Sequence, residues 1–305
     1  MAPRPVRFRV VPQERGTALG ALVGDRLPGL GRREGVELVK AGAVYIGHLR
    51  VRVPSTRVDE GDRITVYPDA LEIRELDPDE ALRFIHRDAS FVVLDKPAGV
   101  PVAATKVTAR GTLSEALRRK LRSEKVERPY VGVVHRLDQG ASGLVMFTIR
   151  GVANKSVHRD FEKHDIARTY RVRVVGDAPD SFDCDAALIE KPGSDSMQVA
   201  KSGQARAKTA RTEFRRVEPA LDIPGTSLLE VSLVTGRTHQ IRVHAAHSGH
   251  PVYGDRRYGE SDADRLHLHA WRLQFDHPLE HGVQLDLQTD LEPWARAKTD
   301  PADTL

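Results

Sequence analysis

The sequence predicts an α+β fold in which a mixed, largely antiparallel central sheet is flanked by helices and a small N-terminal α/β domain precedes it. The first observation is that strand-type segments outnumber helical ones and do not alternate with them as βαβ units require. The second is an acidic stretch at 69–83, which follows Pro68, contains Pro78 and is typical of a linker. The third is the length of 305 residues, which suffices for two hydrophobic cores.

The predicted boundaries follow from changes of pattern along the chain. A strand or extension is expected first, because Val6, Phe8 and Val10 alternate with arginines. The expected segments are an N-terminal strand or extension at 1–15, a small α/β domain at 16–68, a linker at 69–83, a large domain at 84–298 and a tail at 299–305.

Helical spacing followed by strand composition characterises the small domain. Apolar residues recur at helical spacing from Leu19 to Leu27, and a second helix is expected around Val36–Val39, with Gly42 as its stop. The pair Gly47-His48 lies between two strand-type segments, which predicts a hairpin. Strands are expected at 44–46, 49–53 and 64–67.

Short apolar runs dominate the large domain. Thr112 and Glu115 have the spacing of a capping box and predict a helix start, and another helix is expected at 152–163. The short runs are typical of strands in a mixed or antiparallel sheet. They are expected at 91–94, 130–134, 144–149, 170–175, 212–217, 227–234, 273–275 and 284–287.

The bulk composition limits the partners and the compartment. The formal net charge is +4 and arginine predominates among the cations, which fits a polyanionic partner but does not require one. Cys184 is the only cysteine, so no internal disulfide can form and a reducing, cytoplasmic compartment is expected. The sequence has no signal-type apolar start and no apolar run of the ~20 residues that a membrane helix needs, so no membrane association is expected.

The segment from Val134 to Leu144 is the most informative for chemistry. It presents Asp138 beside Arg136 in a glycine-containing turn between two apolar strands, at a sheet edge where sites usually lie. An aspartate that only caps a turn is the alternative. A serine hydrolase is disfavoured, because Gly140–Gly143 lacks the Gly-x-Ser-x-Gly spacing of a nucleophile elbow.

A second segment carries Arg237, His239 and Arg242 at the predicted start of a helix. Helix N-terminal N–H groups and arginines suit a phosphate or a carboxylate, and an ordinary exposed basic helix end is the alternative. Several histidines follow, but their spacing does not match the His-Glu-x-x-His zinc motif and no acidic residue lies among them before Asp255. No metal site is therefore expected.

A third segment places Tyr170 among arginines at the start of a strand. Its ring has the chemistry to stack on a base, and a half-buried packing tyrosine is the alternative. The three segments indicate an RNA-type partner and a carboxylate with basic neighbours. They do not by themselves indicate a reaction.

Taken together and in this order, the segments resemble the RluA family of pseudouridine synthases, over roughly 88–288. The matching motifs are Lys96-Pro97-Ala98-Gly99, His135-Arg136-Leu137-Asp138 with Ser142-Gly143-Leu144, Arg168-Thr169-Tyr170, Gly236 to His244, Gly249-x-Pro251, Gly254-Asp255, Tyr258-Gly259, Leu268-His269-Ala270 and His277-Pro278. Ala141 departs from the family's usual threonine, which removes one turn hydrogen bond worth about 1 kcal/mol.

Residues 16–68 are similar to the ribosomal-protein-type αL RNA-binding domain that often precedes this catalytic domain. Arg32 and Arg33 supply the basic helix start that the resemblance implies. The hairpin departs from the usual pattern, because Gly47-His48 stands where Asn-Gly is common.

The resemblance implies an RNA isomerase that detaches uracil from ribose, rotates it and rejoins it through carbon, without a cofactor. Asp138 is the implied catalytic carboxylate, which attacks the ribose or the uracil ring or acts as a base in a glycal route. Arg242 is its implied ion-pair partner, and Tyr170 is the implied platform for the target base. Arg136 is implied to fill the gap left by the flipped uridine. The residues expected to bind RNA are Arg136, Arg237, His239, Arg32 and Arg33.

The implied partner is ribosomal RNA or transfer RNA, and the additional N-terminal domain favours ribosomal RNA. The competing hypothesis is a catalytically silent RNA-binding ribosome-assembly factor on the same fold. The presence of Asp138, Tyr170 and Arg242 disfavours it. No protein partner is expected, and a monomer is the default.

Overall fold

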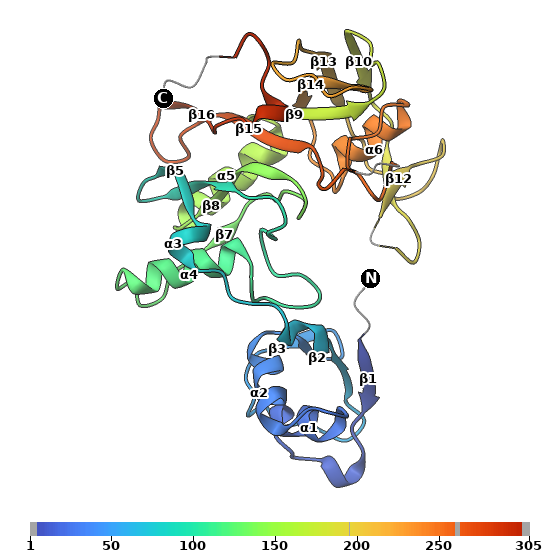
Figure 1. Ribbon diagram of the computed structural model, residues 1–305. Coiled ribbons are helices and arrows are strands. Elements are labelled where there is room, and N and C mark those ends of the chain that lie inside the picture. The colour runs from blue at the N-terminus through green and yellow to red at the C-terminus, as the bar shows by residue number, and fades with distance from the viewer. Residues whose placement is uncertain (1–4, 195, 260–262, 301–305) are drawn as a thin grey trace. The chain divides into compact units, whose positions relative to one another are not determined.

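The computed structural model describes residues 5–194, 196–259 and 263–300 (Figure 1). The chain divides into two compact units. The first comprises the described residues up to Ala81 together with Pro101–Arg128, and the second comprises Leu82–Val100 and the described residues from Pro129 onward. Residues 1–4 of the predicted extension and most of the predicted tail at 299–305 lie outside the described residues.

The first unit contains a four-stranded antiparallel sheet with strand order β1-β4-β2-β3 and two helices before β2. Its core includes Leu19, Leu38 and Ile64, each at most 1% exposed. Its elements are β1 (Val6–Arg9), η1 (Pro12–Glu14), α1 (Leu19–Arg26), α2 (Arg32–Lys40), β2 (Val44–Ile46), β3 (Leu49–Val51), β4 (Arg63–Val66), η2 (Pro68–Leu71) and α3 (Pro78–Ala81).

The predicted elements of the small domain are confirmed, with one difference at its start. The hairpin around Gly47-His48 joins β2 to β3, and α2 begins at Arg32. The sequence placed residues 1–15 outside the small domain, whereas β1 pairs with β4 from Val6↔Val66 to Arg9↔Arg63. The alternation of apolar and basic residues that indicated the strand does not show which sheet receives it.

Residues 101–128 return to the first unit after the chain has begun the second. Their loop is held by hydrogen bonds from the Thr108 hydroxyl (3.0 Å) and the Ala109 N–H (2.9 Å) to the carbonyl of Ala41. Arg110 also pairs with Glu37 of α2 at 3.2 Å. Sequence periodicity did not predict this excursion, because each of these contacts joins residues more than 60 positions apart.

One helix, α4 (Leu113–Ser123), lies within this returning segment. The Thr112 side chain accepts a hydrogen bond from the Glu115 N–H at 3.3 Å, which confirms the predicted helix start with Thr112 as its N-cap. Lys120 of α4 pairs with Asp79 at 2.6 Å, so the predicted linker at 69–83 is tied to α4.

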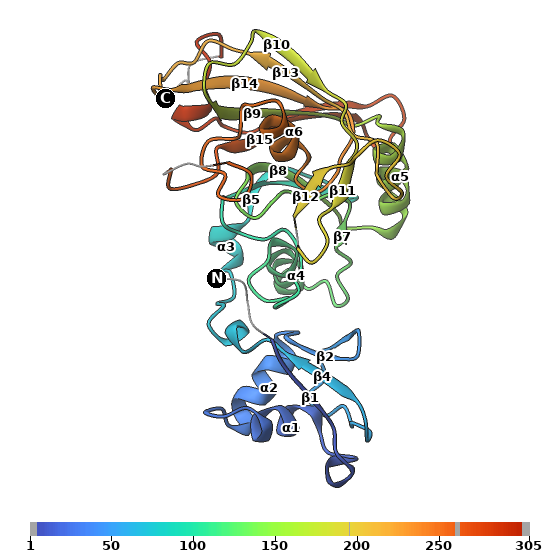
Figure 2. The same ribbon diagram turned by 90° about the vertical axis from the view of Figure 1, so that its right-hand side faces the viewer.

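The second unit is built on a ten-stranded sheet. Strand order along the main path is β10-β13-β14-β9-β15-β8-β6-β5, with β16 paired to β15 and β7 to β8. Figure 2 shows β10, β13, β14, β9 and β15 side by side in that order. Only the β15–β8 pair is parallel among the described pairs, which confirms the predicted mixed, largely antiparallel sheet.

The bounds of this unit's elements agree with most of the predicted runs. The strands and helices are β5 (Arg83–Arg87), β6 (Phe91–Lys96), β7 (Gly132–Val133), β8 (Ser142–Thr148), α5 (Gly151–Lys163), β9 (Ala167–Val175), β10 (Ser181–Cys184), β11 (Leu188–Glu190), β12 (Met197–Val199), β13 (Thr212–Arg216), β14 (Thr226–Leu233), α6 (Gln240–His247), β15 (Leu268–Asp276), β16 (Gln284–Gln288) and η3 (Pro293–Ala295).

Four short strands were not predicted, and β7 is shorter than the predicted run at 130–134. The unpredicted strands β5, β10, β11 and β12 have polar or mixed composition, so their pairing comes from neighbouring strands rather than from an apolar pattern. Strand β7 ends at Val133, and residues 134–138 have no regular secondary structure.

A glycine allows β8 to begin where β15 passes closest. Gly143 has φ +104°, and a Cβ built on it would lie 2.1 Å from the carbonyl oxygen of Ala270. Gly143 and Ala270 are partners in the parallel β15–β8 pair. No other residue type fits this position, since both the backbone conformation and the space exclude a side chain.

We expect Gly143→Ala to lower the free energy of unfolding by roughly 3 kcal/mol or more, through backbone strain and overlap with Ala270. Urea unfolding followed by circular dichroism measures the effect. Gly151→Ala is the matched control, because a Cβ at Gly151 meets nothing within 4 Å. Equal stability of the two variants would contradict the close approach of β8 and β15.

Candidate active site

The loop that carries Asp138 joins β7 to β8 and is anchored by a buried lysine. Lys96 ends β6 and is 0% exposed. Its Nζ donates hydrogen bonds to the carbonyls of Pro97 (2.9 Å), Val100 (2.8 Å) and Gln139 (3.0 Å). Because Gln139 directly follows Asp138, this ammonium group fixes the turn that presents the carboxylate.

Burial lowers the pKa of Lys96 to about 7, and the charge of Asp138 opposes that shift. An ammonium group has three hydrogens, and the three carbonyls use all of them. Loss of the proton would leave one carbonyl without its donor. The hydrogen bonds therefore favour the charged form in spite of burial.

Arg242 holds two carboxylates at once. Its Nη1 donates to Asp138 Oδ2 at 2.8 Å, while Nε and Nη2 donate to the two oxygens of Asp255 at 2.7 Å each. The arginine side chain is 11% exposed and that of Asp138 is 19% exposed. The fork on Asp255 leaves one edge of the guanidinium for Asp138, so the position of Asp138 depends on this geometry.

Asp255 is held as tightly as the arginine that it binds. Its side chain is 0% exposed, and its Oδ1 accepts hydrogen bonds from the backbone N–H groups of Arg257 (2.9 Å) and Tyr258 (3.2 Å). Burial opposes the charge of Asp255, but the bonds from Arg242 outweigh it and lower the pKa of this carboxyl. Burial likewise opposes the charge of Arg242, while Asp255 and Asp138 raise the pKa of the guanidinium.

His239 lies on the other side of the Asp138 carboxylate. Its Nε2 is 3.7 Å from Asp138 Oδ1, and its Nδ1 is 2.7 Å from the hydroxyl of Tyr258. That hydroxyl also accepts the N–H of Met197 at 2.7 Å. Burial lowers the pKa of His239, although the charge of Asp138 opposes this, so the neutral ring is favoured. If Tyr258 donates its proton to Nδ1, the Nε2–H of His239 faces Asp138.

The backbone of His239 is in a left-handed conformation, with φ +55° at the N-cap of α6. A non-glycine residue there costs on the order of 1 kcal/mol or more and persists where its surroundings impose it. The surroundings here are the bonded Tyr258 and the start of α6.

Tyr170 lies in β9, with β14 on one side and β15 on the other. It is 6% exposed, and burial together with the nearby charge of Asp138 raises the pKa of its phenol. The tyrosine is therefore a neutral group close to the carboxylate. This degree of burial also satisfies the packing role that the sequence left open.

Ser142 lies two positions after Gly140 of the turn that follows Asp138. It belongs to a separate buried network. Its hydroxyl lies 2.8 Å from His269 Nδ1 and accepts from Arg265 at 3.2 Å. Glu292 contacts the serine hydroxyl at 3.4 Å and pairs with Arg265 at 2.6 Å. The carboxylate thus contacts the serine rather than the second nitrogen of His269, which differs from the order of a hydrolase triad.

The other predicted residues lie outside this cluster. Arg136 is exposed on the same loop, and Arg237 is half-buried with its Nε bonded to the Thr209 carbonyl at 3.0 Å. Arg32 and Arg33 belong to the first unit at the start of α2. Arg32 pairs there with Asp25 at 3.0 Å.

Lys96, Asp255 and Tyr258 belong to the sequence motifs, but the motifs indicated no role for them. The predicted partner of Arg242 was Asp138 alone, whereas its bidentate partner is Asp255. The signal was the spacing of 13 positions between Arg242 and Asp255. That spacing indicates a contact only after the chain following α6 is known to fold back.

Among the described residues, no group of three or more histidines, cysteines, aspartates and glutamates is placed to hold a metal ion. Cys184 is buried and carries no disulfide. No described helix combines the length and the apolar character that crossing a membrane requires.

The fold and the paired carboxylate define a protein of the pseudouridine synthase class. A solved structure titled "Human RNA Pseudouridylate Synthase Domain Containing 1" is similar with a TM-score of 0.56 and 25% identity, over 68% of this chain and 83% of that one. "Human RNA Pseudouridylate Synthase Domain Containing 4" has the same fold, with a TM-score of 0.56 and 22% identity over 69% and 88% of the two chains.

The chain belongs to the RNA pseudouridylate synthase family, whose sequence model matches residues 90–247. The S4 domain matches residues 26–64, within the predicted small domain. Both matches confirm the resemblance drawn from the motifs. The chain is therefore an isomerase that acts on RNA.

Curated relatives extend the likeness over most of the chain. An "Uncharacterized RNA pseudouridine synthase" of Aquifex aeolicus is 34% identical over 73% of this chain and 71% of its own length. "Ribosomal large subunit pseudouridine synthase D" of Neisseria meningitidis is 32% identical over 86% and 73%. "Ribosomal large subunit pseudouridine synthase C" of Yersinia pestis is 30% identical over 87% and 86%.

Acidification should weaken the fold through His269. Burial lowers its pKa to about 4 from an ordinary 6.5, so the unfolded chain binds this proton first as the pH falls. The contribution of neutral His269 to stability is present above about pH 6.5 and is lost as the pH falls toward 4. The expected loss is up to about 3 kcal/mol.

Urea unfolding at pH 7 and pH 4 tests this expectation with His269→Gln, which takes up no proton in this range. The wild type should lose more stability on acidification than His269→Gln does. His281→Gln, a change at an exposed histidine, should behave as the wild type does. An identical acid loss in the wild type and His269→Gln would remove His269 as the cause.

Proposed function

We propose that this chain converts uridine to pseudouridine in ribosomal RNA and that Asp138 is its catalytic carboxylate. The observation that carries the proposal is the ion pair of 2.8 Å between Asp138 and Arg242, with Arg242 oriented by the buried Asp255. A cation held in a fixed position orients the carboxylate that such a reaction needs. Asp138 also lies within the region that the family model matches.

The reaction breaks the bond between N1 of uracil and C1′ of ribose and forms a bond between C5 and C1′. A proton leaves C5 and one is taken up at N1, so the composition of the RNA does not change and no cofactor is needed. An ionised Asp138 serves as nucleophile or as base. Tyr170 and His239, both favoured as neutral groups, lie near this carboxylate and add no competing charge.

We infer the remaining roles from the family resemblance, and the positions of the side chains support them. Tyr170 forms the platform for the target base, and His239 borders the carboxylate on the other side. Arg136 is exposed just before Asp138, where it enters the gap left by a flipped uridine. Arg237 of the second unit and the Arg32-Arg33 pair of the first contact phosphates.

Ribosomal RNA is the proposed substrate because several relatives are named for the large ribosomal subunit. The S4 domain supports a structured RNA of this kind, since it is an additional RNA-binding unit. We assign the enzyme to the cytoplasm and to a monomeric state.

Deleting the gene should abolish pseudouridine at one or a few sites of ribosomal RNA. Complementation with the wild type should restore these sites, whereas Asp138→Asn should restore none although it keeps the shape of the side chain. Carbodiimide labelling and primer extension map pseudouridine across total RNA. Loss at transfer RNA sites alone would redirect the substrate, and restoration by Asp138→Asn would refute the role of the carboxylate.

Arg242→Met should lower kcat by about 100-fold, because the carboxylate loses its fixed partner. The affinity for RNA should change little, since many phosphate contacts carry it. Release of tritium from [5-³H]uridine in the substrate RNA gives kcat and KM. Arg272→Met, which removes an arginine paired with Asp286 elsewhere in the unit, should leave both unchanged.

A further inference from the structure

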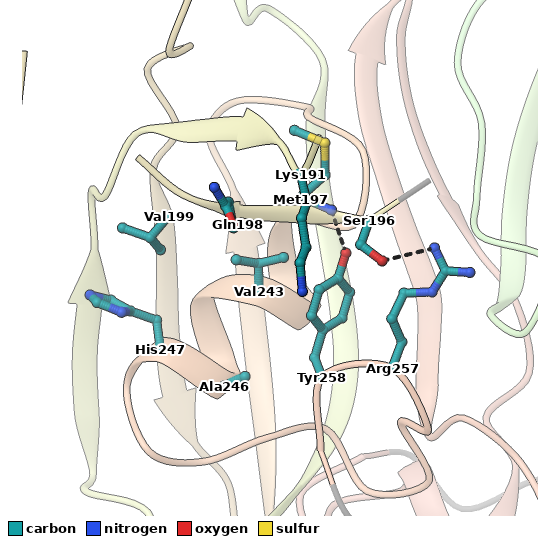
Figure 3. Close-up of a pocket in the computed structure, with 10 residues that line it drawn as sticks. All are labelled: Lys191, Ser196, Met197, Gln198, Val199, Val243, Ala246, His247, Arg257 and Tyr258. Atoms are coloured by element: carbon teal, nitrogen blue, oxygen red, sulfur yellow. Dashed lines mark hydrogen bonds between the residues drawn. The ribbon is translucent and has the colours of Figure 1, made fainter. Parts of the chain in front are cut away.

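A cavity of about 380 Å³ lies between α6 and the hairpin of β11 and β12. Figure 3 shows Val243 and Ala246 of α6 on one side and the β12 strand on the other. Tyr258 stands at one end, and Val199 and His247 lie at the opposite end. The space is a slot of ligand size, since small-molecule pockets span roughly 300–1,000 Å³.

The lining of this slot combines apolar walls with basic side chains. Val199, Val243 and Ala246 supply the walls, and Tyr258 adds an aromatic ring. Lys191, His247 and Arg257 are the basic groups, and Gln198 and Ser196 provide an amide and a hydroxyl. No carboxylate is found among the described residues that line the slot, so an anion with a flat apolar part fits better than a cation or a hydrocarbon.

The slot is adjacent to the catalytic carboxylate through one shared side chain. Tyr258 lines the slot, and its hydroxyl lies 2.7 Å from Nδ1 of His239, whose Nε2 is 3.7 Å from Asp138. The same hydroxyl accepts the N–H of Met197, the first residue of β12. The guanidinium of Arg242 lies over this ring, 5.1 Å from its centroid. Tyr258 is thus a wall common to the slot and to the catalytic cluster.

We propose that this slot binds one unpaired nucleotide of the substrate RNA, next to the target uridine, with the base between α6 and β12 and a phosphate at Lys191 and Arg257. The inference rests on the proposed function, because the RNA must already be held at Asp138. Unpaired bases that leave the stack are recognised by apolar walls, aromatic rings and polar edges, which this lining supplies. Gln198 and Ser196 offer the groups that read a base edge.

The slot selects for sequence next to the modified uridine. The catalytic cluster itself contacts a uridine whatever its neighbours are, so discrimination between uridines requires contacts elsewhere. His239 alone separates Tyr258 of the slot from Asp138. A nucleotide that adjoins the target uridine can therefore reach the slot.

Filling the slot tests the proposal. Ala246→Trp adds a ring inside it and should raise KM for the substrate RNA by about tenfold with kcat little changed, the loss of one stacked base. Val152→Trp adds the same ring on an exposed helix position, 67% exposed, and should match the wild type. Circular dichroism checks that both variants are folded. An unchanged KM in a folded Ala246→Trp variant overturns the proposal.

A pair of lysines separates a pocket contact from general attraction to RNA. Lys191 lines the slot, whereas Lys201 is an exposed lysine shortly after β12. Lys191→Met should raise KM severalfold, and Lys201→Met should not. Equal effects of the two changes would show only non-specific electrostatics and would overturn the phosphate contact.

Free nucleotides distinguish the source of the ligand and separate this proposal from the proposed function. AMP, GMP, CMP and UMP are each added at millimolar concentration to the full wild-type chain and to Ala246→Trp, and contact is read by saturation-transfer NMR. A raised KM together with loss of a nucleotide contact in Ala246→Trp supports the proposal. Loss of that contact with unchanged KM means that the slot takes a free nucleotide, which overturns the assignment to RNA. Absence of pseudouridine formation by the wild type refutes the proposed function, whatever the slot binds.

Discussion

The bidentate bond between Arg242 and Asp255 is the constraint on which the site depends. Without Asp255, the guanidinium would be free to turn, and Asp138 would have a cation nearby but no fixed direction toward it. Asp255 is itself held by two backbone N–H groups and is fully buried, so the orientation of the pair is set before any RNA arrives. Of the two carboxylates that Arg242 holds, Asp138 is the partly exposed one at 19%, whereas Asp255 is fully buried.

Most ionisable groups around this trio are kept from competing with it. Burial favours the neutral forms of His239 and Tyr170, as the directions of their pKa shifts show. The exception is Lys96, whose three carbonyl partners favour its proton although burial acts against it. The site is therefore preorganised by one buried lysine with three carbonyl acceptors and one buried arginine that donates to two carboxylates.

The fold class and the elements with strong local patterns were predictable from the sequence. The hairpin at Gly47-His48, the cap at Thr112 and the strand of Tyr170 follow from spacing and turn chemistry that act over a few residues. The pairing of β1 with β4, the attachment of residues 101–128 to the first unit and the short strands β10 to β12 do not, because tertiary contacts decide them. At the site, motifs predicted Asp138 and Arg242. The contact of Asp255 with Arg242 depends on the folding of α6 and the following turn, so local patterns did not predict it.

The return of residues 101–128 to the first unit limits how the domain organisation of this protein can change in evolution. The two units are not consecutive along the chain, since the first unit is encoded by two stretches of the gene with part of the second between them. A recombination that removed everything before residue 82 would remove Ala41 and Glu37. Thr108 and Ala109 would then lose the carbonyl that they bind, and Arg110 would lose its carboxylate partner. Loss or exchange of the RNA-binding unit in a descendant would thus require a matching change in a distant loop, which favours joint inheritance of the two.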